Sequence, residues 1–241
     1  YKINFKEIKK MKVVILAGGL GTRISEYTKT IPKPMIKVCG KPLIHRIMNH
    51  YINFGHTEFI IALGYKGNLI KKYFSRVKFK KNVKINLIDT GLKTMTGGRL
   101  KRLKKYLNET FMMTYGDGLS NINISKLIKF HENKKKIFTL TAVRPPARFG
   151  VIKIKNSMVK VFREKNSLDH GWINGGFFVI EPEFIKYIKN DQTFLEREPF
   201  NKATKKKQLV AFKHSGFWQC MDTIRDKEIL EEKIKSKEHL E

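Results

Sequence analysis

The sequence predicts an α/β fold, a Rossmann-like three-layer sandwich with a mostly parallel central sheet between helices. Two observations lead to this prediction. Short apolar runs alternate with amphipathic stretches through the first half of the 241-residue chain, which is typical of βαβ units. The first run, KVVILA at 12–17, is rich in β-branched residues and suits a parallel strand buried on both faces. We therefore expect right-handed crossovers between parallel strands.

The elements of the first half follow from this alternation. The stretch PLIHRIMNHYINF at 42–54 places Leu43, Ile47 and Tyr51 at helical spacing, with a proline suited to the first turn. Three further strands and two further helices are expected after it. The strands are predicted at 58–65, 83–89 and 110–118, and the helices at 66–75 and 97–107.

The second half predicts a different arrangement, because its apolar runs follow one another closely. Such spacing favours a smaller antiparallel or mixed extension of the sheet. The strands of this extension are predicted at 137–143, 149–155, 158–165 and 172–180. Helical stretches at 183–189 and 194–206, a strand at 209–214 and a last helix at 224–235 complete the pattern.

The chain shows no linker, repeat or low-complexity segment. We therefore predict a single domain at 11–235, with residues 1–10 as an N-terminal extension and 236–241 as a tail. No apolar run approaches the roughly 18 residues that span a bilayer, and the first ten residues lack the apolar core of a signal peptide. Cys39 and Cys220 are the only cysteines, too few for a disulfide framework, so a cytoplasmic location is predicted.

The net charge of +29 raises the alternative of nucleic-acid binding. The charge comes from 40 lysines and 10 arginines spread along nearly the whole chain. Readers of bases and phosphates favour arginine for its bidentate fork, and the sequence has no arginine-rich tract and no zinc-finger spacing. We therefore favour a lysine-solvated surface over specific nucleic-acid binding. Such a surface would also concentrate phosphorylated substrates near a cleft.

The end of the first strand carries the most informative motif. Gly18, Gly19 and Gly21 would let the backbone approach a ligand and present its N–H groups to oxygens. Arg23 follows at once, and Lys33 lies between two prolines that stiffen its segment. The pattern is neither the dinucleotide fingerprint nor the P-loop. A glycine turn with two solvated cations would explain each residue singly, but their combination indicates a phosphate site at the carboxyl end of a parallel strand.

LAGGLGTR and PKPM, at 16–23 and 32–35, resemble the signature of the sugar-1-phosphate nucleotidylyltransferases. MTGGR at 95–99 is similar to a segment of the glucose-1-phosphate cytidylyltransferases within that family. TYGDG at 114–118, FG at 149–150, INGGFFV at 173–179 and GFWQCMDT at 216–223 follow in the order of that subfamily. The resemblance implies the nucleotide-diphospho-sugar transferase fold and the reaction of CTP with α-D-glucose 1-phosphate to CDP-glucose and pyrophosphate. Such a product would serve surface-polysaccharide synthesis.

The resemblance also implies two sets of binding residues. Arg23 and Lys33 would be catalytic, by neutralising charge on the nucleotide phosphates. The nucleotide would be bound by Leu16, Ala17, Gly18, Gly19, Gly21, Thr22, Arg23, Lys33, Thr96, Gly97, Gly98 and Gly116. The sugar phosphate would be bound by Tyr115, Gly150, Glu164, Lys165, Asn174 and Gly175.

Asp117 and Asp222 would together hold one Mg²⁺, which prefers oxygen ligands. Taken singly, Asp117 suits a turn and Asp222 suits a helix N-cap. Only the resemblance pairs them. It also raises Lys165 above an ordinary surface lysine, although EKN replaces the usual EKP at 164–166.

The stretch at 75–88 is shorter than the corresponding insertion in well-known cytidylyltransferases. This departure leaves base specificity and the predicted homo-oligomer open. The alternatives are the same fold with another nucleotide, another sugar phosphate or a non-sugar acceptor. Two further alternatives remain: a regulatory or binding homologue without turnover, and a basic nucleic-acid-binding protein.

Overall fold

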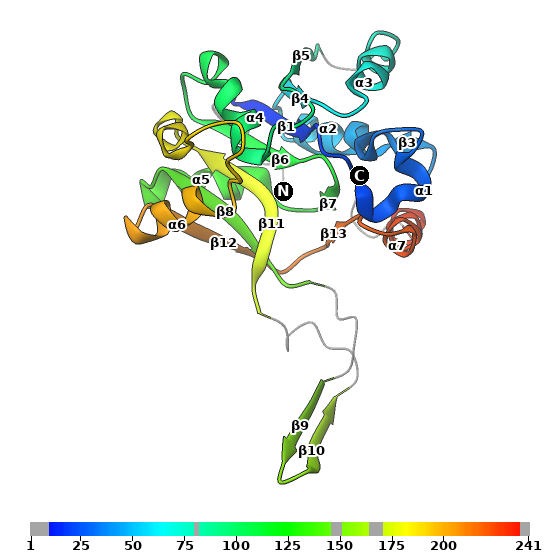
Figure 1. The fold of residues 1–241 in the computed structure, drawn as a ribbon, viewed down its shortest axis with the longest axis vertical. Coiled ribbons are helices and arrows are strands. Elements are labelled where there is room, and N and C mark those ends of the chain that lie inside the picture. Colours follow the sequence, from blue (N-terminus) through cyan, green and yellow to red (C-terminus); the bar gives the residue numbers. More distant parts are fainter. Residues whose placement is uncertain (1–9, 80–81, 146–150, 164–170, 237–241) are drawn as a thin grey trace, which may run out of the picture.

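The computed structural model describes residues 10–79, 82–145, 151–163 and 171–236. Their centre is a seven-stranded sheet in the order β12-β8-β11-β6-β1-β4-β5 (Figure 1). Neighbouring strands are parallel, except that β11 runs antiparallel to both β6 and β8. The strands are β1 (Lys12–Ala17), β4 (Glu58–Leu63), β5 (Lys84–Asp89), β6 (Phe111–Tyr115), β8 (Phe138–Val143), β11 (Ile173–Ile180) and β12 (Leu209–His214).

Two hydrophobic cores cover the two faces of this sheet, because side chains alternate along each strand. On β1, Val13 and Ile15 enter one core and Val14 and Leu16 the other. The first core is closed by α2 (Leu43–Asn53), α3 (Gly67–Phe74), α5 (Ile124–Lys134) and α7 (Ile224–Lys235). The second is closed by α4 (Thr96–Arg102), η5 (Pro182–Tyr187) and α6 (Glu198–Lys205). The predicted three-layer α/β fold is confirmed.

The predicted mixed extension is only partly separate from the main sheet. Two of its four strands, β8 and β11, lie in the central sheet between β12 and β6. The other two, β9 (Val151–Lys155) and β10 (Met158–Arg163), form a two-stranded antiparallel hairpin of their own (Figure 1). The four strands follow one another closely in the sequence but do not share one sheet. β11 lies inside the central sheet because it pairs with β6 on one side and with β8 on the other.

Two helices were missed from the sequence, the four-residue α1 (Ser25–Thr28) and the longer α5. α5 has Ile124, Leu127, Ile128 and His131 on its buried face, which is the i, i+3, i+4, i+7 pattern of an amphipathic helix. Asn123 caps its start, since the side-chain oxygen accepts from the Lys126 N–H at 2.8 Å. The predicted helix at 194–206 begins later, at Glu198. The predicted helical stretch at 183–189 is a 3₁₀ segment.

Four short strands shape the edge of the sheet that carries the site. β2 (Lys37–Val38) pairs with β3 (Lys41–Pro42), and β7 (Gly118–Ser120) pairs antiparallel with β13 (Trp218–Cys220). The Met221 N–H also donates to the Asp117 carbonyl at 2.8 Å. This pairing brings the segment after β6 beside the segment before α7, although the two are far apart in the sequence.

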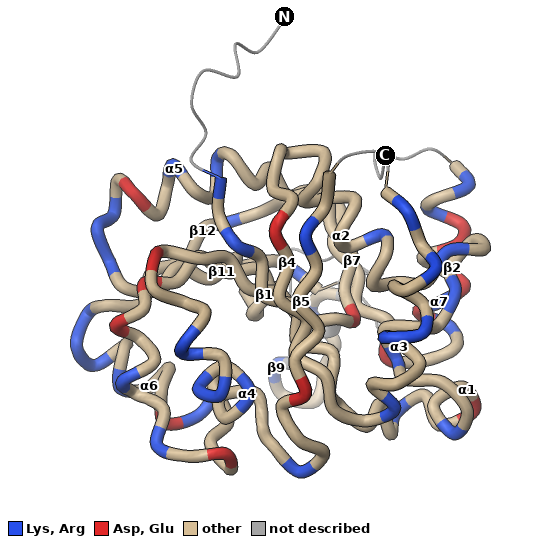
Figure 2. Tube along the Cα trace, turned by 90° about the horizontal axis from the view of Figure 1, so that it is seen from above, with Lys and Arg blue, Asp and Glu red and all other residues tan. Residues whose placement is uncertain are grey.

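Lysine and arginine lie on helices and loops across the whole of the view in Figure 2. This distribution agrees with a solvated surface, as the sequence favours. Within the described ranges, no helix is both long and apolar enough to cross a membrane.

Candidate active site

A cavity of about 330 Å³ lies beyond the carboxyl ends of β1 and β6. All predicted nucleotide-binding residues line it except Gly97 and Gly98. Gly18 follows β1 and must be glycine, since a Cβ there would lie 2.1 Å from the Arg99 guanidinium. Gly21 has φ +66°, in the left-handed region that favours glycine. The glycine motif is therefore used both for close approach and for a turn.

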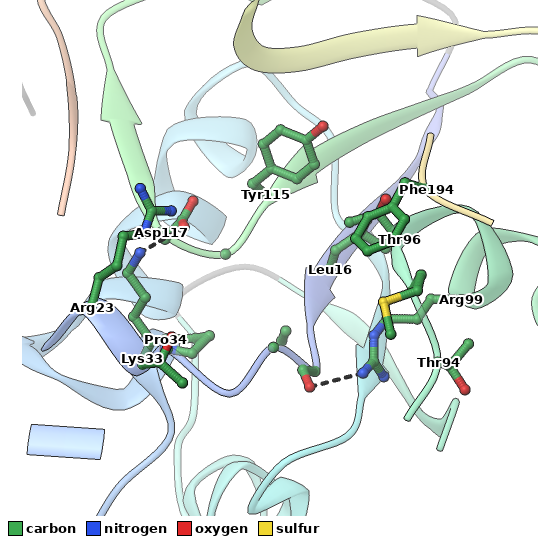
Figure 3. Close-up of a pocket in the computed structure, with 17 residues that line it drawn as sticks. Leu16, Arg23, Lys33, Pro34, Thr94, Thr96, Arg99, Tyr115, Asp117 and Phe194 are labelled. Atoms are coloured by element: carbon green, nitrogen blue, oxygen red, sulfur yellow. Dashed lines mark hydrogen bonds and ion pairs between the residues drawn. The ribbon is translucent and has the colours of Figure 1, made fainter. Parts of the chain in front are cut away.

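Arg23, Lys33 and Asp117 lie together at one end of this cavity (Figure 3), and Asp222, which lines a neighbouring cavity, joins them. The Lys33 ammonium lies 2.8 Å from Asp117 Oδ2 and 2.6 Å from Asp222 Oδ1. Arg23 Nη1 lies 2.6 Å from Asp222 Oδ2. Lys33 is only 7% exposed, while the Arg23 side chain is 71% exposed. A fixed cation and an accessible cation therefore share one carboxylate.

The elements around this cluster explain its geometry. Lys33 begins a 3₁₀ turn, η2 (Lys33–Met35), between Pro32 and Pro34, which restrict the backbone on both sides. Asp117 occupies the turn between β6 and β7. Asp222 follows β13, and its N–H donates to Asp226 Oδ2 at 3.0 Å. The sequence alternative of Asp222 as an N-cap is wrong, because Thr223 caps α7 in a capping box with Asp226.

The charges in this cluster stabilise one another's ionised forms. Burial opposes ionisation of Asp222, but the Lys33 ammonium and then Arg23 hold the pKa of Asp222 below its ordinary value. Burial also opposes the charge on Lys33, but Asp117 and Asp222 raise the pKa of Lys33 above its ordinary value. The cluster therefore keeps both opposite charges at neutral pH in a partly buried site.

A second cavity, of about 210 Å³, meets the first at Arg23, Tyr115 and Asp117. Asn174 and Gly175 line it, as does Trp218. The Trp218 Nε1–H donates to the Gly175 carbonyl at 2.7 Å. Asn174 is fixed by the Gly176 N–H, which donates to its Oδ1 at 2.9 Å. These are the predicted sugar-side positions Tyr115, Asn174 and Gly175; Gly150, Glu164 and Lys165 lie outside the described residues.

The structure shows a packing role for Gly97 and Gly98, and their place beside the base stays a prediction. Both N–H groups point to the Thr193 carbonyl, at 2.9 and 3.2 Å. A Cβ at Gly97 would lie 2.6 Å from the Thr193 oxygen, and one at Gly98 would lie 2.4 Å from the Asp191 oxygen. These glycines therefore allow α4 to pack closely on the segment at 191–195. Thr96, one residue earlier, does line the cavity.

Arg99 is the main residue of this site that sequence reasoning missed. It is 4% exposed, and its guanidinium donates to the carbonyls of Gly18, Leu63 and Gly91 at 2.8 to 3.0 Å. Arg99 and Lys33 both line the cavity, and they lie on opposite sides of the view in Figure 3. Burial lowers the pKa of Arg99, and Asp89 partly opposes this. The MTGGR segment contained the signal, but attention to its glycines left Arg99 without a role.

The segment at 193–197 was also missed as part of the site. Phe194 lines the first cavity, and Arg197 stacks on its ring at 4.5 Å. The Glu196 carboxylate accepts from the Thr96 hydroxyl at 2.8 Å and from the Tyr115 hydroxyl. No sequence motif marked this segment, because its partners come from α4 and β6.

A glycine loop, held cations and two carboxylates at the carboxyl ends of parallel strands are the features expected of a nucleotide-phosphate site. The chain belongs to the nucleotidyl transferase family, whose match extends over residues 12–226. It is 47% identical to the glucose-1-phosphate cytidylyltransferase of Salmonella typhimurium, over 92% of this chain and 95% of that protein. It is 41% identical to the probable glucose-1-phosphate cytidylyltransferase of Bacillus subtilis, over 90% and 93%. The family resemblance and the enzyme class predicted from the motifs are confirmed.

Solved structures agree with this family. HddC from Yersinia pseudotuberculosis superposes with a TM-score of 0.74 at 26% identity, over 93% of this chain and 99% of that one. A UDP-glucose pyrophosphorylase complexed with UDP-glucose has a TM-score of 0.71 at 18% identity, over 95% and 100%. The second likeness concerns the fold alone.

Proposed function

We propose that this chain transfers the cytidylyl group of CTP to α-D-glucose 1-phosphate, giving CDP-glucose and pyrophosphate. The observation that carries the proposal is the meeting of two cavities at Arg23, Tyr115 and Asp117, beside the buried Lys33. A nucleotide in one cavity and a sugar phosphate in the other would have their phosphates at this junction. Relatives named glucose-1-phosphate cytidylyltransferase, at 41 to 47% identity, support the choice of substrates.

In the proposed reaction a phosphate oxygen of the sugar phosphate attacks the α-phosphorus of CTP in line. The new P–O bond forms as the bond to the β-phosphate oxygen breaks, and pyrophosphate leaves with that electron pair. The attacking oxygen is already ionised, so the step needs no general base. Catalysis then consists of positioning and charge neutralisation.

The residues at the junction have complementary parts in this scheme. The exposed Arg23 and the backbone N–H groups of Gly18 and Gly19 would hold the β- and γ-phosphates. Lys33, buried and fixed by its prolines, would neutralise charge near the α-phosphate. On the sugar side, Asn174 would bind a sugar hydroxyl. Lys165, outside the described residues, would bind the sugar phosphate.

The carboxylates of Asp117 and Asp222 fit one Mg²⁺. Both approach the same point, since each has an oxygen within 2.8 Å of the Lys33 ammonium. Two carboxylates supplemented by phosphate oxygens and water are the usual donors for this ion. Bound there, Mg²⁺ would neutralise phosphate charge beside the Lys33 ammonium. Within the described residues, no third acidic, histidine or cysteine side chain completes a metal cluster.

The test is pyrophosphate release with Mg²⁺ across CTP, dTTP, UTP, ATP and GTP, each with and without glucose 1-phosphate. We expect release with CTP that depends on glucose 1-phosphate. Release with another nucleotide would contradict the cytosine assignment and keep the reaction class. If CTP releases no pyrophosphate with glucose 1-phosphate but does so with another sugar phosphate or a non-sugar phosphate, the assigned acceptor is wrong. The EKN sequence at 164–166 motivates that comparison.

Four further predictions belong with this function. A homo-oligomer is predicted, which light scattering of the purified protein measures. A cytoplasmic location and a role in surface-polysaccharide synthesis follow from a nucleotide-sugar product. The alternative of specific nucleic-acid binding predicts tight association that weakens steeply with salt, whereas we expect weak binding that is lost at physiological salt.

A further inference from the structure

Tyr115 forms a wall that the two cavities share. Its ring packs edge-on against Phe178, with centroids 5.3 Å apart, and lies against Gly176, where a Cβ would lie 2.6 Å from the ring. Gly176 has φ +77°, so the chain bends there to admit the ring. The orientation of Tyr115 therefore fixes the boundary between the proposed nucleotide and sugar-phosphate sites.

The Tyr115 hydroxyl lies in a chain of hydrogen bonds that crosses this boundary. It donates to Glu196 Oε1 and accepts from Asn174 Nδ2 at 3.4 Å. The other Glu196 oxygen accepts from the Thr96 hydroxyl at 2.8 Å. A phenol is protonated at neutral pH, so the Tyr115 hydroxyl can donate to this carboxylate. One carboxylate thus links the nucleotide side, at Thr96, to the sugar side, at Asn174.

The backbone around Glu196 is held by other contacts. The Thr193 carbonyl accepts from the N–H groups of Gly97 and Gly98. The Met95 N–H donates to the Asp191 carbonyl at 2.8 Å. Asp191 also pairs with Arg102 at 2.6 Å. The segment at 191–195 would therefore keep its place without the Glu196 side chain. The carboxylate is directed at Tyr115 and Thr96 and is exposed on its outer side.

We propose that Glu196 is a positioning residue, which holds Tyr115 and Thr96 so that the two substrates meet in line at the junction of the cavities. This inference rests on the proposed function and adds a residue that the motifs did not reveal. Because an in-line reaction depends on the distance and angle of the attacking oxygen, a small turn of Tyr115 would reduce turnover more than it reduces nucleotide binding.

The test compares Glu196→Gln with wild type, in the full chain with Mg²⁺. We expect kcat with CTP and glucose 1-phosphate to fall by about 10- to 100-fold, and KM for glucose 1-phosphate to rise. The Kd of CTP, measured by calorimetry without sugar phosphate, should stay within about twofold, because the glycine loop and Arg23 are untouched. Glu196→Gln leaves one acceptor oxygen where the carboxylate has two, and Tyr115→Phe removes the hydroxyl that donates to this group. The double variant should therefore lose little beyond the larger single effect.

Glu198→Gln is the matched control, since Glu198 lies two residues on and pairs with exposed Lys189 at 3.7 Å. It should behave as wild type in turnover and in melting temperature. An active wild type with an equally active Glu196→Gln variant would overturn the inference alone. Loss of CTP binding in step with turnover would also overturn it, since that is the pattern of a general structural defect. An inactive wild type would instead contradict the proposed function.

Discussion

Lys33 and Arg99 are both buried cations in the wall of one cavity, but opposite kinds of partner hold them. The Lys33 ammonium contacts the carboxylates of Asp117 and Asp222. The Arg99 guanidinium donates to backbone carbonyls, such as that of Gly18. An ammonium can exchange a carboxylate for a phosphate oxygen when substrate arrives, whereas a backbone carbonyl has no substitute there. Both side chains are buried, so burial does not distinguish them. The kind of partner does: Lys33, paired with carboxylates, is suited to binding substrate phosphate, whereas Arg99, bonded to backbone carbonyls, is suited to stabilising the fold.

The largest expected effect tests the first half of this comparison. Lys33→Met keeps a long side chain and removes the charge, so turnover of CTP and glucose 1-phosphate should fall by about 100- to 1000-fold. Steady-state pyrophosphate release measures this. If activity is unchanged while the protein remains folded, Lys33 has no part in the reaction and the comparison is broken.

Arg99→Met tests the second half, and its effect should appear in stability. The substitution removes the buried guanidinium and its hydrogen bonds to the carbonyls of Gly18, Leu63 and Gly91, so the free energy of unfolding should fall by about 3 kcal/mol. Urea denaturation measures it. Arg102→Met is the control on the same helix: its side chain is 45% exposed and pairs with Asp191, so a loss of about 0 to 1 kcal/mol is expected. Equal losses would contradict the scaffold role.

Metal affinity gives a further test of the role of the Lys33 charge beside its two carboxylates. In wild type the Lys33 ammonium occupies the point on which Asp117 and Asp222 converge. Lys33→Met should therefore bind Mn²⁺ without nucleotide about tenfold more tightly, because the carboxylates lose a competing cation. Titration followed by electron paramagnetic resonance measures the affinity. Unchanged affinity in this variant would argue against a metal site at these two carboxylates.

His56 extends the comparison to a buried basic group that stays uncharged at neutral pH, and its effect should appear only as the pH falls. Its Nδ1 accepts from the Met11 N–H at 3.2 Å, and burial lowers the pKa of His56 to about 4. The unfolded chain, with a pKa near 6.5, therefore binds more protons between pH 6.5 and 4. Through this group, stability should fall as pH drops through that window, by about 1.4 kcal/mol per pH unit.

His56→Gln should remove this contribution while leaving stability at pH 8 to be compared separately. Urea denaturation of both proteins at several pH values between 4 and 7 gives the two slopes. An equal slope in the variant would mean that His56 is not the group that couples protonation to unfolding.

Local patterns were enough for the strands and for the glycine motif. β1 could be predicted because its residues are apolar on both faces, and Lys33 because two prolines frame it. The central position of β11 could not, since it depends on pairing with both β6 and β8. α5 could have been predicted from its apolar spacing and from Asn123, but the short polar stretches around it hid the pattern.

In the candidate site too, the residues of a local motif could be predicted and the residues that depend on distant partners could not. Arg23 and Lys33 belong to a contiguous motif, so the sequence marks them. Arg99 and Glu196 act through partners on other segments: Glu196 lies 100 residues from Thr96 and 81 from Tyr115. A single sequence carries no record of such distant contacts. Gly97 and Gly98 show why a glycine alone does not identify a role, since close packing and ligand approach require the same small residue.

The pairing of β7 with β13 also has a consequence for the order in which the protein is made. Lys33 and Asp222 are 189 residues apart, and Asp222 reaches its place only when the segment after β12 folds back beside Asp117. A chain still emerging from the ribosome, or one cut short before β13, would have its glycine loop and its main sheet strands but only one of the two carboxylates. The reactive junction is therefore completed near the end of synthesis, after the surrounding sheet can already fold.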